Sequence, residues 1–231
     1  MNNLIKDIEN TTKHSFSQST FRLEERGNGI YAISGDYLTE AINNWNNQQE
    51  LINVLKWFDD FWLFLEIRFI KVNNEYKSWK KDKRDEFLNI LTQQFIKFEQ
   101  DFYQTFVTLS VFQGDDSDKV KTQLFRAEWD SFEENKVHPQ PHWHIYPDKY
   151  GLKIAEDFET FIDSQKEAGF VEFVKPASIG KIIDLRKFHF AMNGDWIKEN
   201  RHIHSIENDE TLLKWLSGIL GHIKEQLEYT K

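Results

Sequence analysis

The chain has 231 residues, of which 39% are hydrophobic and 15% aromatic, so it contains enough apolar material to form a core and is not expected to be disordered. Its net charge of -9 argues against a wide electrostatic contact with nucleic acid, although it leaves room for a small basic pocket. Because the chain has no cysteine, disulfides, thiolate metal sites and cysteine nucleophiles are excluded.

The N-terminal residues lack the basic segment, apolar stretch and cleavage site of a signal peptide. The most apolar run, residues 61–70, contains Glu66 and Arg68 and is too short to cross a bilayer. We therefore expect a cytoplasmic protein that has no membrane partner.

The first expected element is a β-hairpin over residues 21–34, with its turn at Gly27-Asn-Gly29. A long helical hairpin is expected next, because apolar residues then recur at spacings of three and four in two successive segments, 51–76 and 88–102. Residues 61–70 taken alone also fit a buried strand, but the continuous stripe on both sides favours a helix. The stripe residues are Leu51, Leu55, Phe58, Trp62, Leu65, Phe69, Val72 and Tyr76, then Leu88, Leu91, Phe95, Phe98 and Phe102.

After residue 105 the period changes to two, which predicts strands at 107–111, 123–130 and 142–146. An amphipathic helix is expected over residues 211–229. These elements predict an α+β fold, in which a mainly antiparallel sheet is covered by the helical hairpin and the C-terminal helix. We expect one domain over residues 1–231, with a helix-rich part at 1–104 and a strand-rich part at 105–231.

Three of the eight histidines lie in the segment His138-Pro-Gln-Pro-His-Trp-His144. On a strand, His142 and His144 point to one face and Trp143 to the other. The strand 123–130 has the same parity, since Arg126 and Glu128 alternate with apolar residues. If the two strands are antiparallel neighbours, all four polar side chains share one face. The connection over residues 131–141 is long for a hairpin, so the sequence leaves this pairing open.

Three chemistries fit this set of residues. His142, His144 and Glu128 could ligate Zn²⁺, Mn²⁺ or Fe²⁺, with Arg126 stabilising the charge of the substrate. Without a metal, a glutamate base, a histidine acid and an arginine suffice to cleave RNA. Without turnover, Arg126 could pair with an anionic ligand. His189 is a candidate third ligand or second acid–base group, and the spacing of His202 and His204 repeats that of the first pair.

A structural interpretation competes with each of these functions, because charged residues on a strand face are often only solvated and histidines often bond backbone carbonyls. The leading hypothesis is a hydrolase, such as a nuclease, that acts on a phosphodiester or another small anionic or nucleic-acid substrate with a bound divalent metal. The first alternative is a non-catalytic module that binds a protein partner and contains structural histidines. The second alternative is a metal-free ribonuclease.

Overall fold

The computed structural model describes residues 1–45, 48–130, 140–146 and 206–230, and all structural statements below concern these residues. The helices are α1 (Asn2–Thr12), α2 (Lys81–Gln94) and α4 (Asp209–Tyr229), with short 3₁₀ helices η1 (Lys13–Ser15) and η2 (Asn74–Ser78). The strands are β1 (Arg22–Gly27), β2 (Ile30–Ser34), β3 (Leu38–Trp45), β4 (Gln48–Phe58), β5 (Phe61–Lys71), β6 (Ile96–Phe98), β7 (Asp101–Gln113), β8 (Thr122–Asp130) and β9 (His142–Ile145).

These strands form one antiparallel sheet of nine strands, whose main path is β1-β2-β5-β7-β8-β9. The β3–β4 hairpin joins this path through a short pairing of β4 with β5, and β6 pairs with β7. The expected α+β class, with a mainly antiparallel sheet, is confirmed for the part of the chain that the structure describes.

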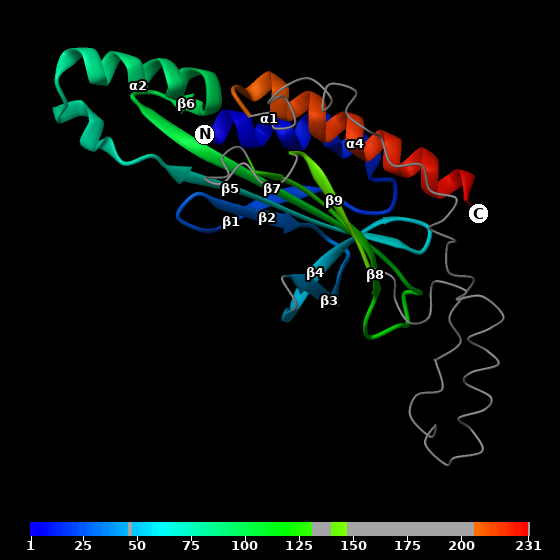
Figure 1. The fold of residues 1–231 in the computed structure, drawn as a ribbon. Coiled ribbons are helices and arrows are strands. Elements are labelled where there is room, and N and C mark those ends of the chain that lie inside the picture. Colours follow the sequence, from blue (N-terminus) through cyan, green and yellow to red (C-terminus); the bar gives the residue numbers. More distant parts are fainter. Residues whose placement is uncertain (46–47, 131–139, 147–205, 231) are drawn as a thin grey trace.

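Helices α1 and α4 lie together on one face of the sheet (Figure 1). The fully buried residues of α4 recur every three or four positions and form one stripe: Leu212, Leu216, Leu220, Ile223 and Leu227. On β8 and β9 the residues that face the helices are apolar, and the indole of Trp129 contacts that of Trp215 on α4 with ring centroids 5.1 Å apart. The core therefore lies between the sheet and these two helices, as an apolar stripe on each helix requires.

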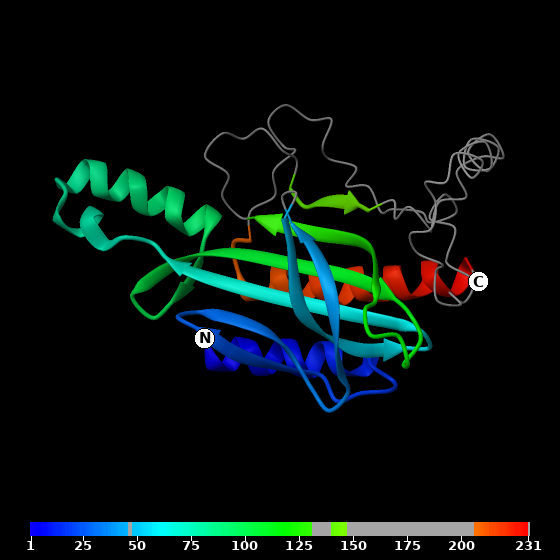
Figure 2. The same cartoon turned by 90° about the horizontal axis from the view of Figure 1, so that it is seen from below.

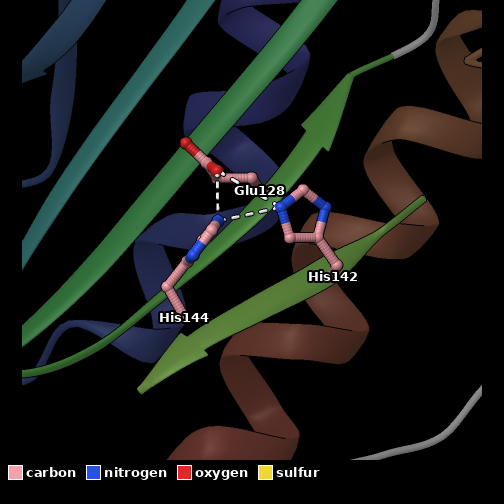
Figure 3. Close-up of side chains that lie close together, drawn as sticks. All are labelled: Glu128, His142 and His144. Carbon is pink, nitrogen blue, oxygen red and sulfur yellow. Dashed lines mark hydrogen bonds and ion pairs between the residues drawn. The ribbon is translucent and has the colours of Figure 1, made fainter. Parts of the chain in front are cut away.

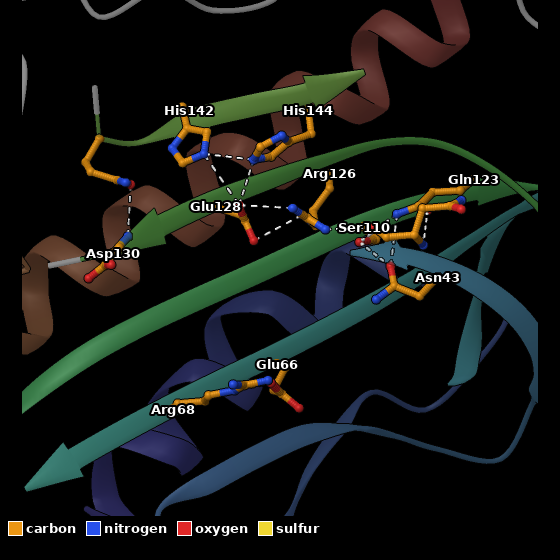
Figure 4. Close-up of polar contacts among 12 residues, drawn as sticks. Asn43, Glu66, Arg68, Ser110, Gln123, Arg126, Glu128, Asp130, His142 and His144 are labelled. Atoms are coloured by element: carbon orange, nitrogen blue, oxygen red, sulfur yellow. Dashed lines mark hydrogen bonds and ion pairs between the residues drawn. The ribbon is translucent and has the colours of Figure 1, made fainter. Parts of the chain in front are cut away.

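The other face of the sheet is crossed by the β3–β4 hairpin (Figure 2). This face carries polar side chains such as Ser110, Arg126 and Glu128 (Figure 4). Ala41 of β3 forms an isolated parallel bridge with Lys121, the residue before β8. Under this crossing, Asn43 and Ser110 are fully buried and Gln123 nearly so. A buried polar layer of this kind must satisfy its own hydrogen bonds, which limits how the hairpin can sit on the sheet.

The expected long helical hairpin is wrong in its first half. Residues 48–71 form the strands β4 and β5, joined by the two-residue turn Asp59–Asp60, in which Asp59 has φ of 47°. In the second half, α2 covers residues 81–94 only, and residues 96–98 and 101–102 belong to β6 and β7. Residues 1–104 are consequently not helix-rich where they are described, because strands β1 to β6 lie within them.

The other expected elements that fall on described residues are confirmed. The hairpin at 21–34 is β1 and β2, the period-two segments are β7, β8 and β9, and the C-terminal helix is α4. The turn between β1 and β2 needs Gly29, whose φ is +76° and where a Cβ atom would lie 2.5 Å from the carbonyl oxygen of Phe69. No helix in the described ranges is both long and apolar enough to cross a membrane.

Candidate metal centre

The register of β8 and β9 places four polar side chains on one face of the sheet. Arg126 is the Cα partner of His144, and Glu128 is the partner of His142 (Figure 4). Residues opposite each other in an antiparallel pair share a face, and so do residues two apart on one strand. The predicted convergence of these four residues is therefore confirmed, despite the long connection between the two strands.

Contacts on the apolar face and at both ends of β9 hold it in this register. On the apolar face, Trp143 packs against Phe125 with ring centroids 5.6 Å apart in an edge-to-face arrangement. At the start of β9, the side-chain oxygen of Gln140 accepts a hydrogen bond of 3.0 Å from the backbone N–H of Asp130. At its end, the N–H of Tyr146 donates to the carbonyl of Leu124 over 3.2 Å.

Three side-chain atoms converge at the centre of this site (Figure 3). The Nε2 atoms of His142 and His144 are 2.8 Å apart, and the Nε2 atom of His144 is 2.8 Å from Oε2 of Glu128. The Nε2 atom of His142 is 3.4 Å from the same oxygen. The Nε2 atom of His144 thus lies within hydrogen-bond distance of both an imidazole nitrogen and a carboxylate oxygen.

These separations match the edges of a metal coordination polyhedron. For metal–ligand bonds of about 2.1 Å, neighbouring ligand atoms lie about 3.0 Å apart in octahedral and about 3.4 Å apart in tetrahedral geometry. Among the described residues, Glu128, His142 and His144 are the group of histidine and acidic side chains whose potential ligand atoms lie this close together. The three residues therefore fit a divalent metal without a change of strand register.

Arg126 lies behind Glu128 and is 1% exposed. Its Nε atom is 3.0 Å from Oε1 of Glu128, and its Nη2 atom donates to Oε2 of the same carboxylate over 3.2 Å. Its Nη1 atom donates to the backbone carbonyl of Asn44 over 2.7 Å. The sequence pattern predicts that Arg126 neutralises the charge of a substrate, but in the structure its guanidinium contacts the protein's own carboxylate.

The carboxylate of Glu128 is held in its ionised form. Burial opposes ionisation, but hydrogen bonds from His142 and His144 and the charge of Arg126 outweigh it, and they hold the pKa of Glu128 well below its usual range. An ionised carboxylate is the form that ligates a metal, whereas a general acid must carry a proton. The electrostatics thus favour the role of ligand for Glu128 over that of proton donor.

The lowered pKa of Glu128 predicts how stability depends on pH. In the unfolded chain this group titrates near the ordinary glutamate pKa of about 4.3, so its stabilising contribution is complete above that pH and is lost as the pH falls towards the folded-state pKa. We expect the difference in unfolding free energy between the native protein and Glu128→Gln, measured with urea in chelator, to be constant above about pH 5 and to shrink below about pH 4.

The matched control for this titration is Glu66→Gln, because Glu66 is paired with Arg68 on the same face of the sheet but outside the metal-ligand group. Its difference from the native protein should be smaller at every pH. A Glu128→Gln difference that grows between pH 5 and pH 3 would mean that the pKa of Glu128 is raised by folding, and would contradict the prediction.

Sequence reasoning missed the residues that support Arg126 from behind. The side-chain oxygen of Gln123 accepts hydrogen bonds from the backbone N–H and the side-chain amide of Asn44, at 2.7 and 3.0 Å. The amide nitrogen of Gln123 donates to Oδ1 of Asn43 over 3.0 Å. The aromatic ring of Tyr146, which shares the parity of the two histidines, lies 5.8 Å from the guanidinium carbon of Arg126. Parity along β9 could have identified Tyr146, but nothing in the sequence pointed to Asn44.

The remaining predicted site residues fall elsewhere. His189, proposed as a third ligand or acid–base group, lies outside the described residues, and so do His202 and His204.

Comparison with protein-family models, with curated proteins and with solved structures found no match to this chain. Any assignment of function therefore rests on the geometry of the site itself.

Proposed function

We propose that this protein binds one divalent transition metal through His142, His144 and Glu128 and uses it to hydrolyse an anionic ester, such as a phosphodiester. The observation that carries the proposal is the convergence of two imidazole nitrogens and one carboxylate oxygen at 2.8 to 3.4 Å. Two histidines and one carboxylate leave coordination positions open, as catalytic rather than structural metal sites do.

The ligand types restrict the choice of metal. Imidazole nitrogens suit Zn²⁺ and Fe²⁺ and the carboxylate oxygen also suits Mn²⁺, whereas Mg²⁺ and Ca²⁺ prefer sites made of oxygen atoms alone. A metal held in this way lowers the pKa of a bound water and polarises an ester oxygen. The three side chains contribute by fixing the position of the ion on a rigid pair of strands, where each ligand is held by the sheet register.

The position of Arg126 supports a metal-assisted reaction over a metal-free one. A metal-free phosphodiesterase needs a cation that contacts the phosphate, and the guanidinium of Arg126 is 1% exposed and bound to Glu128 and Asn44. A base of strongly lowered pKa is also a weak proton acceptor at neutral pH. In our proposal the missing positive charge is supplied by the metal.

The test is a comparison of metal content with hydrolysis in the purified full-length protein. We expect about one Zn²⁺, Mn²⁺ or Fe²⁺ per chain after dialysis against the ion. We also expect turnover of bis(p-nitrophenyl) phosphate that is lost in excess chelator and restored by the same ion. His142→Ala should lose both metal and turnover, whereas His222→Ala on α4 should keep both.

Three outcomes would overturn this proposal. A protein that takes up no metal is not a metallohydrolase, and metal uptake that His142→Ala leaves unchanged places the ion elsewhere. Cleavage of RNA that persists in excess chelator would favour the metal-free ribonuclease.

A further inference from the structure

Arg126 differs in its surroundings from Arg68, another arginine on the same sheet face. Both arginines are two residues from a glutamate with which they pair: Arg126 with Glu128, and Arg68 with Glu66 (Figure 4). The Arg68 side chain is 42% exposed, whereas that of Arg126 is 1% exposed. An exposed pair of this kind contributes little, but a buried guanidinium must be held by several partners. The partners that hold the buried guanidinium therefore indicate the role of Arg126 in the site.

The two oxygens of Glu128 have different neighbours. The guanidinium of Arg126 contacts both of them: its Nε atom is 3.0 Å from Oε1, and its Nη2 atom donates to Oε2 over 3.2 Å. Oε2 is the oxygen that approaches both imidazoles, at 2.8 Å from His144 and 3.4 Å from His142. A carboxylate held in plane by a guanidinium fork presents to a metal the oxygen that also faces the imidazoles, here Oε2.

The guanidinium is itself fixed from the opposite side. Its Nη1 atom donates to the carbonyl of Asn44, and the N–H of Asn44 donates to Gln123. Arg126 is thus clamped between the β3–β4 hairpin and Glu128, and its fork geometry sets the plane of the carboxylate. A lysine in this place would keep the charge but could not fix that plane.

The charge of Arg126 also alters what the centre attracts. An arginine is always protonated, so its positive charge offsets the negative charge of Glu128. With two neutral imidazoles, the protein groups then contribute no net charge, and a divalent ion keeps its full charge towards a further ligand. Such a centre favours an anionic ligand at the open coordination positions.

We infer that Arg126 is a positioning residue, which makes Glu128 a one-oxygen ligand through Oε2 and leaves the bound metal charged enough to take a phosphate-type anion. This inference rests on the proposed metal site and adds the mode of coordination and the class of ligand. It assigns Arg126 no direct contact with the substrate.

The test uses Co²⁺ as a spectroscopic probe in the full-length native protein and in Arg126→Gln and Arg126→Lys. We expect Arg126→Gln to weaken Co²⁺ binding by about 10- to 100-fold, as loss of an outer partner of a metal ligand does. Its cobalt absorption bands should shift, because both oxygens of Glu128 can then reach the ion. Inorganic phosphate should perturb the cobalt spectrum of the native protein at lower concentration than that of Arg126→Gln.

Arg126→Lys separates charge from geometry. It should recover the response to phosphate but not the native cobalt bands. Arg68→Gln is the matched control, since it removes an arginine–glutamate pair of the same spacing outside the ligand group, and it should leave the cobalt spectrum unchanged. Circular dichroism is used to verify that each variant is folded.

Native cobalt affinity, bands and phosphate response in Arg126→Gln would overturn the inference and leave the proposed metal site intact. A native protein that binds no cobalt and none of the other three ions would overturn both. If the Arg126 variants fail to fold, X-ray absorption of the native zinc-loaded protein decides. The short metal–carbon distance of a two-oxygen carboxylate would contradict the inference, and its absence would support it.

Discussion

His144→Ala should weaken metal binding by more than about 100-fold, which is the upper limit for loss of an outer partner of a ligand, and should abolish metal-dependent hydrolysis. His144 has the central place in the group, because its Nε2 atom is 2.8 Å from both Nε2 of His142 and Oε2 of Glu128. Its removal leaves one imidazole and one carboxylate, too few ligands to hold a transition metal against water. Competition with a chromophoric chelator measures the change in affinity.

The stability of the fold should hardly change in this variant, since the His144 side chain is 38% exposed. Thermal unfolding in chelator verifies this, and His222→Ala provides the comparison for loss of a histidine elsewhere. If His144→Ala binds metal as tightly as the native protein does, the three converging side chains are not the ligands.

Glu128→Leu should lower the unfolding free energy by about 3–5 kcal/mol, even without metal. The reason is that the substitution leaves Arg126 without its ion-pair partner. The guanidinium of Arg126 is almost fully buried, and removal of Glu128 takes away the carboxylate that balances its charge. A buried charge that has lost its partner cannot recover its hydration without opening the structure. Urea unfolding of the metal-free protein measures the loss.

Two further variants show whether this explanation holds. Replacement of both partners, by Arg126→Met with Glu128→Leu, should recover most of the lost stability, because no uncompensated charge then remains. Glu66→Leu removes the partner of the more exposed Arg68 and should cost at most about 1 kcal/mol. A double variant as unstable as Glu128→Leu alone would show that the loss does not come from the charge of Arg126.

The site could be predicted further than the fold. Period-two alternation on residues 123–130 and 142–146 sets the face of each side chain, and only one parity buries Trp143 with Phe125. The convergence of Glu128 with both histidines follows once the two strands pair. The pairing itself could not be predicted, because the connection over residues 131–141 carries no hairpin turn signal.

The helical hairpin was mispredicted because both faces of β5 are buried. Trp62 and Phe64 are buried on the face of Ser110, while Leu63 and Leu65 are buried on the opposite face, so the strand shows no alternation between apolar and polar residues. In a continuous apolar run, apolar residues lie at every spacing, including the spacings of three and four that are typical of a helix. The sequence signals that favoured a β-hairpin over a helix were the pair Asp59–Asp60 and the aromatic content of both segments.

Contacts between distant residues were beyond the reach of local patterns. The hydrogen bond from Arg126 to the carbonyl of Asn44 joins positions 82 residues apart, and it depends on the crossing of the β3–β4 hairpin over the sheet. A sequence pattern shows that Arg126 is polar, but only the packing shows that it is buried.

The register of β9 ties the chemistry of this protein to its correct folding. If β9 slipped by one residue, both imidazoles would turn into the apolar core, and the indole of Trp143 would turn out to the polar face. A misaligned chain therefore cannot form a partly competent centre, because the error removes the two imidazole ligands together. Selection for activity on such a strand is at the same time selection for fidelity of strand pairing.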